Sequence, residues 1–283
     1  MISPYVRRLR LGRELLARRQ EQGMSSEQVG RATRLHRTSI SRLENGQVRP
    51  DVNNVIKILD CLGVTGDDWT KLIQIAREAG ERGWWESHAE EMGERQAMVA
   101  NLEAGAASIR EYHLTLIPGL LQTPEYTAAR AAVDTAERSA AFNAARSIEA
   151  RAARQRMLHR PGGPTYEVIV DELAVRRLSA AVSVMRGQLA HLAKMAQASQ
   201  VTAYLLPVDV EIEGHTVPRS SFSIYTYPDP DDPVVVAVDT VTSDLVLTEP
   251  DQVGHYLALY ERLRTSALAP AESARVLAKA AKR

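Results

Sequence analysis

Arginine, threonine and serine side chains gather on one face of a short predicted helix around residue 40. They are Arg37, Thr38, Ser41 and Arg42. At helical spacing, Ile40 and Leu43 fall on the opposite, apolar face. An arginine can donate two hydrogen bonds to a guanine, and the methyl group of a threonine can contact thymine. These four side chains therefore have the chemistry to contact base edges in the major groove of DNA.

Two short helices joined by a tight turn have to position these side chains. Ser25 or Ser26 can cap the first helix, because a serine hydroxyl accepts a backbone N–H at a helix start. Residues 34–35 form the turn, and the second helix opens at His36 or two residues later. It ends at the Asn-Gly pair at 45–46, since glycine readily takes the left-handed conformation that closes a helix.

The run MSSEQVGRATRLHRTSISRLENG at residues 24–46 resembles the helix-turn-helix of phage-repressor-type regulators, the XRE or Cro/C1 family. TSISRLENG is its most diagnostic part, and the resemblance extends from about residue 11 to residue 62. It implies base contacts by Arg37, Thr38 and Arg42, with Ser41 on the same face. The positions for which it implies phosphate or capping contacts are Ser25, Ser26 and Asn45, together with Arg49 in the following loop.

Two positions depart from the pattern of that family. Gly30 stands where alanine is usual, which costs about 1 kcal/mol of helix propensity. Thr33 stands where leucine is common. We therefore expect a loosely packed core in this small region.

Charge is distributed unevenly along the 283 residues, although the net charge is zero. Residues 1–50 hold eleven arginines, four glutamates and no lysine, a net charge of +7, so the remaining residues sum to −7. A basic N-terminal region on an acidic remainder is typical of a protein that binds a polyanion. The alternative is a solvated, arginine-rich helix surface.

Cysteine content and hydropathy indicate the compartment. Cys61 is the single cysteine, so no intrachain disulfide can form, which fits a reducing cytoplasm. We expect it to be a small, buried apolar residue. No run of about 18 apolar residues predicts a membrane span, and the N-terminus lacks the pattern of a signal peptide. The expected location is the cytoplasm, in association with the nucleoid.

The chain is long enough for two domains, and the predicted fold class combines an all-α head with an α/β or α+β domain. Five short helices over residues 1–80 form the head, and a glycine-containing break at 80–83 precedes the second domain, 81–283. Two helices are expected over 124–158, with the break at Asp134-Thr135. The sequence predicts five or six strands, at 108–117, 166–170, 201–206, 221–227, 234–239 and 245–247, with a hairpin turn at PDPDDP, 228–233.

Separated motifs beyond residue 84 resemble a second family. They are WW at 84–85, SIREY at 108–112, PGLLQTPEY at 118–126, RAARQRML at 151–158, VDEL at 170–173 and the C-terminal YERLRTSALAPAESARVL. The resemblance is to an uncharacterised domain behind repressor-type heads in actinobacterial, Streptomyces-like regulators, the Scr1-like group. It implies a transcription regulator that is often paired with a small partner protein, and it implies no known reaction. The glycine that this family usually has after its Leu-Arg-Arg segment is replaced by Ser179 and two alanines.

Three further sets of residues could support other chemistry. Trp84-Trp85 could stack on a ligand or a base, although we favour an anchoring role for the pair. Asp171-Glu172 at a strand end could be a catalytic acid pair, an ion pair with a following arginine, or a helix cap. Gln122, Tyr126 and Glu172 could form a pocket for a ligand or partner. The seven histidines show no i, i+4 pair and none lies near the cysteine, so no metal site, cofactor or catalytic residue is predicted.

The sequence thus predicts a non-enzymatic transcription regulator that binds double-stranded DNA as a homodimer. Its C-terminal domain would respond to a small-molecule effector or to a small acidic partner protein. An alternative is the protein-binding half of a toxin–antitoxin-like pair in which DNA binding serves autoregulation. A third is an enzyme fused to a DNA-binding head, which a deep polar pocket with a perturbed acid or histidine would favour.

Overall fold

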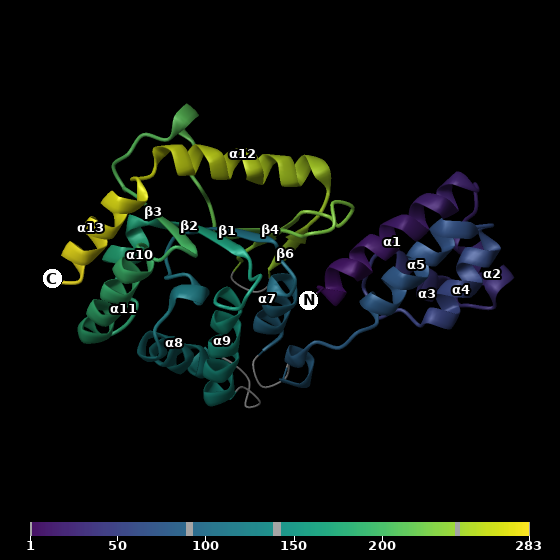
Figure 1. Ribbon diagram of the computed structural model, residues 1–283, viewed down its shortest axis with the longest axis horizontal. Coiled ribbons are helices and arrows are strands. Elements are labelled where there is room, and N and C mark those ends of the chain that lie inside the picture. Colours follow the sequence, from purple (N-terminus) through teal and green to yellow (C-terminus); the bar gives the residue numbers. More distant parts are fainter. Residues whose placement is uncertain (1, 89–92, 138–142, 241–243, 283) are drawn as a thin grey trace. The chain divides into compact units, whose positions relative to one another are not determined.

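The computed structural model describes residues 2–88, 93–137, 143–240 and 244–282 (Figure 1). Contacts divide the chain into two compact units. The first comprises residues 1–86 together with 227–233, and the second comprises residues 87–226 and 234–283.

Five α-helices build the first unit, as expected for the head. They are α1 (Pro4–Glu21), α2 (Ser26–Thr33), α3 (Arg37–Glu44), α4 (Val52–Cys61) and α5 (Gly66–Ala79), followed by the 3-10 helix η1 (Trp84–His88). Polar side chains stop and start these helices. Ser3 caps α1 and Asp51 caps α4, each by accepting a backbone N–H. Gly46 takes the predicted left-handed conformation after α3, with φ +64°.

The apolar faces of these helices meet in one core. Its fully buried members include Leu11, Leu15, Val29, Ile40, Val55, Leu59 and Leu72, and Cys61 is partly buried against it. The Thr33 hydroxyl is buried but donates a 2.8 Å hydrogen bond to the carbonyl oxygen of Val29, so this polar group is satisfied inside the core. In η1, Trp85 is 3% exposed and Trp84 is 40% exposed.

The second unit is a mixed sheet with helices, which confirms the predicted α+β arrangement. Its strands are β1 (Ser108–His113), β2 (Thr165–Asp171), β3 (Val201–Leu206), β4 (Phe222–Thr226), β5 (Val235–Val238) and β6 (Leu245–Leu247). Its helices are α7 (Glu94–Glu103), η2 (Gly119–Leu121), α8 (Pro124–Glu137), α9 (Ala144–Leu158), α10 (Glu172–Arg176), α11 (Val182–Met195), η3 (Glu213–His215), α12 (Pro250–Ser266) and α13 (Pro270–Ala280).

The strands form one six-stranded sheet in the order β3-β2-β1-β4-β5-β6. The first three strands run parallel to one another, which requires the helical crossovers that lie between them in the sequence. β4 pairs antiparallel with β1, and the remaining pairs, β4–β5 and β5–β6, are also antiparallel. The hairpin predicted at 228–233 therefore joins β4 to β5. β5 is an interior strand, as its continuous apolar run indicated.

Helices cover both faces of the sheet (Figure 1). α12 packs on the face that carries Tyr112, Phe222 and Ile224, where Tyr260 and Leu263 of that helix join the core. The helices α7, α8, α9 and α11 lie on the other side of the sheet. Because consecutive side chains of a strand point to opposite faces, β4 and β5, which are buried at nearly every position, contribute to a core on each face of the sheet.

Two local predictions differ from the structure. The break expected at Asp134-Thr135 is wrong, because α8 continues through both residues to Glu137. Alanine-rich sequence keeps helix propensity high through that stretch, which outweighs the Asp-Thr signal. The strand expected over 108–117 ends at His113, ahead of the Pro118 turn.

Candidate nucleic-acid interface

The predicted helix-turn-helix is present as α2, a tight turn and α3. Ser25 caps α2 through a reciprocal pair with Gln28: the serine hydroxyl accepts the backbone N–H of Gln28, and the glutamine side chain accepts that of Ser25. Arg34 takes a left-handed conformation at φ 59° and turns the chain. His36 then caps α3, its Nδ1 accepting the backbone N–H of Thr38.

A close approach of backbones at the turn explains the glycine at position 30. A Cβ placed on Gly30 would lie 2.7 Å from the carbonyl oxygen of Leu35. Such a contact is far closer than packed atoms tolerate. The departure from the usual alanine therefore fits the tight path of this turn.

The four predicted base-contacting side chains lie together on one exposed surface. Ser26, Arg37, Thr38, Ser41 and Arg42 line one open concavity of about 370 Å³. All but Ser26 belong to α3. The Thr38 hydroxyl lies 2.7 Å from Nδ1 of His36, which leaves its methyl group as the part available to a base. The structure thus brings all four base-contact candidates to the exposed side of α3, opposite the buried Ile40 and Leu43.

The residues predicted to contact phosphate have different surroundings. Ser26 shares the concavity with the α3 side chains, whereas Ser25 is engaged as a helix cap. The Asn45 side chain donates a 2.7 Å hydrogen bond to the carbonyl oxygen of Ser41. Arg49 forms an ion pair with Glu86 and is half-buried. Phosphate contacts by these four residues stay a prediction, and Arg49 would have to exchange its partner to make one.

The eleven arginines of residues 1–50 differ in what their guanidinium groups contact. Six form ion pairs with carboxylates: Arg7, Arg10, Arg18, Arg19, Arg31 and Arg49. Arg8 lies over the ring of Tyr5, and Arg13 donates to a backbone carbonyl. Arg34, Arg37 and Arg42 are exposed, and their guanidinium groups have no partner among the described residues. These three all belong to the turn and to α3. Arg34 is a candidate that sequence reasoning missed, because the family pattern treats this position as part of the turn.

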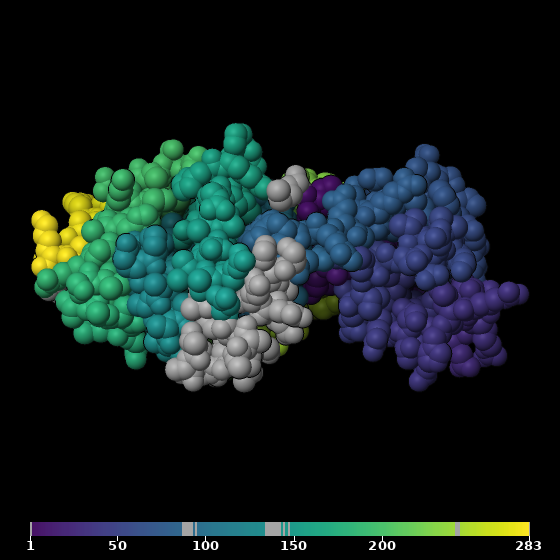
Figure 2. All heavy atoms as spheres, turned by 90° about the horizontal axis from the view of Figure 1, so that it is seen from below, coloured from purple at the N-terminus to yellow at the C-terminus, as the bar shows by residue number. Residues whose placement is uncertain are grey.

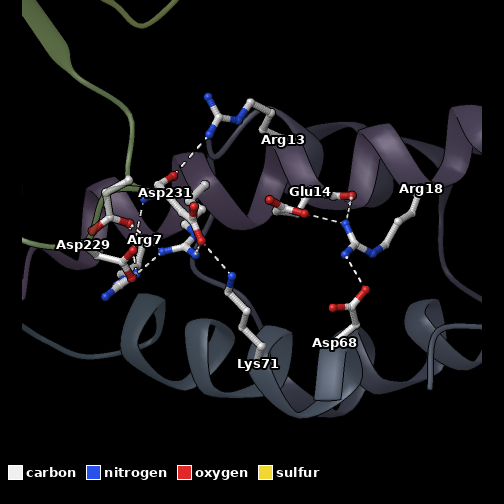
Figure 3. Close-up of polar contacts among 10 residues, drawn as sticks. Arg7, Arg13, Glu14, Arg18, Asp68, Lys71, Asp229 and Asp231 are labelled. Atoms are coloured by element: carbon white, nitrogen blue, oxygen red, sulfur yellow. Dashed lines mark hydrogen bonds and ion pairs between the residues drawn. The ribbon is translucent and has the colours of Figure 1, made fainter. Parts of the chain in front are cut away.

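An acidic loop accounts for much of the pairing at the start of α1 (Figure 3). Residues 227–233 contribute three aspartates to the first unit. Arg10 donates to Asp229 at 2.6 Å and to Asp231 at 2.8 Å, and Arg7 donates to Asp232 at 2.9 Å. These arginines are the main reason that the pKa of Asp229 lies below its ordinary range despite its partial burial.

The whole first unit is therefore much less basic than residues 1–50 suggest. Residues 51–86 contain four basic and seven acidic side chains, and the loop adds three aspartates, so the unit has a net charge of +1. Among the arginines of residues 1–50, those without a partner among the described residues are concentrated at α3 and the turn before it. The charge distribution, rather than the net charge, marks this surface as the candidate interface.

Comparison with protein families agrees with both units. A model of a domain of unknown function, DUF5753, matches residues 96–279. The chain belongs to the DUF5753 family. A helix-turn-helix family model, HTH_3, matches residues 15–69, so this DUF5753 protein is a DNA-binding regulator of the XRE type. No curated protein and no solved structure is similar enough to the chain to count as a relative.

The three residues proposed for a pocket in the DUF5753 domain do not converge on one cavity. Gln122 is buried, and its amide nitrogen donates to the carbonyl oxygen of Ile117 at 2.8 Å, so its role is to hold the PGLLQT turn. Tyr126 is fully buried and its hydroxyl lies 2.7 Å from that of Ser179. Glu172 lines a separate surface cavity. Its neighbour Asp171 caps α10 through the backbone N–H of Leu173.

The Asp171-Glu172 pair has the two structural roles considered as alternatives to catalysis. Asp171 is the cap of α10 and also accepts a 2.8 Å hydrogen bond from the Tyr112 hydroxyl. Glu172 forms an ion pair with Arg176 at 2.6 Å. Its pKa is lowered because hydrogen bonds from Val208 and Arg176 outweigh the effect of partial burial. Neighbours within the domain thus favour the ionised form of the Glu172 carboxylate.

A buried polar cluster surrounds Glu111 of β1. This carboxylate accepts hydrogen bonds from the hydroxyls of Tyr166 and Ser223, and His113 lies 3.3 Å away. Burial lowers the pKa of His113, but the hydrogen bond and charge of Glu111 outweigh it and raise the pKa above its ordinary value.

A second buried ion pair joins two helices on the same side. Nε and Nη2 of the Arg154 guanidinium donate to the two carboxylate oxygens of Glu103, at 2.8 and 2.6 Å. Both residues are almost completely buried, so each charge depends on the other. Within the described ranges, no group of three or more His, Cys, Asp or Glu side chains has the arrangement of a metal site. Nor is any helix there long and apolar enough to cross a bilayer.

Proposed function

We propose that this protein is a sequence-specific transcription regulator in which α3 enters the major groove of its operator. Arg37 and Arg42 would donate to base edges, with the Thr38 methyl and the Ser41 hydroxyl beside them. Arg34, at the start of the turn, would contact phosphate. The observation that carries this proposal is that, of the eleven arginines in residues 1–50, the three exposed ones without a partner among the described residues all lie in the turn and α3.

We propose that the active species is a homodimer. A single recognition helix contacts about four base pairs, which is too short a sequence to select one operator in a genome. Two copies reading half-sites one helical turn apart would double the length of the recognised site. Mass measurement at micromolar concentration, with and without operator, is expected to show a dimer. A monomer under both conditions would contradict this part of the proposal.

The DUF5753 domain is proposed to control DNA binding as a binding domain rather than as an enzyme. Its two adjacent carboxylates at the end of β2 have structural partners, and its buried Glu103 and Glu111 do as well. With these carboxylates engaged inside the domain, the role proposed for it is the binding of an effector or a small partner protein.

Selection from random oligonucleotides, followed by affinity measurements, tests the DNA-binding proposal. Arg42→Ala is expected to cost about 1–3 kcal/mol on the selected operator and to relax the preference at one position. Arg34→Ala should weaken binding to all sequences about equally and reduce the slope of affinity against salt by about one. Arg82→Ala, an exposed arginine beyond α5, is the control and should change neither quantity.

The outcomes separate base contacts from general electrostatics. Equal losses on all duplexes for Arg42→Ala would mean that Arg42 touches only phosphate. If selection at low ionic strength gives no preferred sequence with the wild-type protein, the proposed function is wrong.

A further inference from the structure

A cavity of about 560 Å³ opens within the second unit between α10, α11, α13 and the end of β3. In Figure 2 the yellow surface of the C-terminal helix borders the green surface of the segment that contains α10 and α11. The volume lies in the range of pockets that take small organic ligands. The residues that line it belong neither to the helix-turn-helix nor to the buried polar cluster around Glu111.

The floor of this cavity is apolar and recessed. Its side chains, each between 1% and 8% exposed, are Val175, Met185, Leu189 and Leu205. Water inside an apolar hollow lacks hydrogen-bond partners, whereas an apolar guest makes dispersion contacts with the walls. The Met185 side chain is flexible, so it can adapt to guests of different shape. The floor therefore favours an apolar occupant.

Polar groups beside the floor make their hydrogen bonds within the domain. The backbone N–H of Leu205 donates to the Ser273 hydroxyl at 2.9 Å. The Glu172 carboxylate accepts from Arg176 at 2.6 Å and from the backbone N–H of Val208 at 3.0 Å. These groups are satisfied without a ligand. A charged ligand would therefore lose hydration on entering without gaining new partners on the floor.

Apolar side chains also surround the mouth of the cavity. Leu178 and Val182 belong to the lining and are 67% and 47% exposed. Val208, which contacts Glu172 of the lining through its backbone, is 52% exposed. Exposed branched side chains continuous with an apolar hollow are typical of a surface that a ligand covers. A flat protein surface would cover the mouth and leave the recessed floor empty, so a small molecule is the better fit.

The basic residues of the lining lie at its edge. Arg176, Arg186 and Lys279 are exposed, so their charged ends are at the protein surface and not on the floor. Long basic side chains commonly border apolar surfaces with their aliphatic stems. The apolar floor, rather than the charge at the edge, thus indicates the class of ligand.

We infer that this cavity binds a small uncharged apolar molecule, with an alkyl chain or a ring system as its main part. The molecule would lie on the floor and cover Leu178 and Val182 at the mouth. The inference rests on the effector part of the proposed function and deepens it, because it names the site and the chemical class of the effector. It does not depend on how α3 contacts DNA.

Calorimetry on the full-length protein tests the class of ligand with 1-octanol as the probe. 1-Octanol is expected to bind, and 1-butanol, with half the chain length, is expected to bind about tenfold more weakly or less. Octanoate and octylammonium should both bind more weakly than 1-octanol, because a charged group loses hydration in an apolar site. Tighter binding of either ion than of 1-octanol would overturn the inference.

Two variants test the site. Ala280→Trp places a large side chain in the lining and should weaken 1-octanol binding about tenfold or more, whereas Ala278→Trp, exposed on the same helix and outside the lining, is the matched control. Leu178→Ser changes a side chain at the mouth that is already exposed, so folding should not suffer. It should weaken 1-octanol binding about threefold. Its control is Val217→Ser, which is 78% exposed and outside the lining.

Full affinity for 1-octanol in both cavity variants, or equal losses in the variants and their controls, would overturn the inference. A change from dimer to monomer in either cavity variant would also overturn it, because the cavity would then be an interface between copies. Operator affinity is measured on the same samples. Absence of 1-octanol binding with intact operator binding overturns the inference alone, whereas failure of the wild type to select an operator concerns the proposed function.

Discussion

At the scale of single residues, the contacts of each side chain decide its role more than its type does. Arg10 and Arg42 are both arginines of the basic N-terminal region. The Arg10 side chain is 1% exposed and surrounded by aspartates, whereas Arg42 is exposed and has no partner among the described residues. Only the second can exchange water for a DNA base without first breaking an ion pair.

The raised pKa of His113 predicts a pH dependence of stability. A histidine whose pKa is higher in the folded state contributes stability below its unfolded pKa, near 6.5. That contribution is lost as the pH rises through the folded pKa. The second unit should therefore unfold at a lower temperature at pH 8.5 than at pH 6, by an amount that corresponds to about 1.4 kcal/mol for each unit of raised pKa.

Thermal unfolding of His113→Gln measures this contribution. The variant should lose most of the difference between pH 6 and pH 8.5, because Glu111 then has no titrating partner at 3.3 Å. His255→Gln, an exposed histidine on α12, should keep the difference. An unchanged pH dependence in His113→Gln would show that the Glu111–His113 pair does not control it.

At the scale of elements, backbone contacts position the recognition helix. α1 crosses α3 at Gly12, where an added Cβ would lie 2.3 Å from the carbonyl oxygen of Glu44. Arg19 of α1 also forms an ion pair with Glu44, and its Nε lies 2.6 Å from the Glu44 carboxylate. The position and orientation of the end of α3 thus depend on Gly12 of α1 and on the ion pair between Arg19 of α1 and Glu44 of α3.

Gly12→Ala is expected to destabilise the first unit by about 1–3 kcal/mol, since the backbone of Glu44 cannot move aside without shifting α3. Operator affinity should fall with it. Gly254→Ala is the matched control: it also lies inside a helix, but its Cβ would meet no atom within 4 Å. That substitution should be neutral or stabilising by up to about 1 kcal/mol in chemical unfolding. Equal effects of the two substitutions would contradict the crossing argument.

At the scale of the whole molecule, the first unit includes a segment from far along the chain. Arg10 and Asp229 are 219 positions apart in the sequence but 2.6 Å apart in space. The loop at 227–233 forms ion pairs with Arg7 and Arg10 of α1, and Asp231 also pairs with Lys71 of α5 at 2.7 Å. The stability of the head is therefore expected to depend on residues outside the first 86.

Asp232→Ala should lower the free energy of unfolding of the first unit by about 2–3 kcal/mol. Its carboxylate is 5% exposed and accepts from both Arg7 and Arg10, whose charges would stay behind without it. Asp68→Ala removes an exposed partner of Arg18 and should change stability by less than about 0.5 kcal/mol. Urea unfolding of the two variants makes the comparison. If Asp232→Ala is as stable as Asp68→Ala, the loop contributes little to the head.

The sequence by itself determined the elements and the face of α3 that carries the polar residues. Helical periodicity, serine and aspartate caps and the glycine after α3 act over a few residues, so they can be read without knowing the fold. The six strands were predicted for the same reason, since alternation and apolar runs are local patterns. The resemblance of residues 24–46 to repressor heads then indicated the function of that face.

Only the tertiary structure decided which charges remain without partners. Counting residues 1–50 gives a strongly basic region, yet six of its arginines are paired with carboxylates that come from as far as Asp232. Likewise, Gln122 and Glu172 are both polar residues near strand or turn ends, but one is buried in a turn and the other lines a surface cavity. Ion pairs and cavities depend on distances in space between residues remote in sequence, and no local pattern encodes those distances.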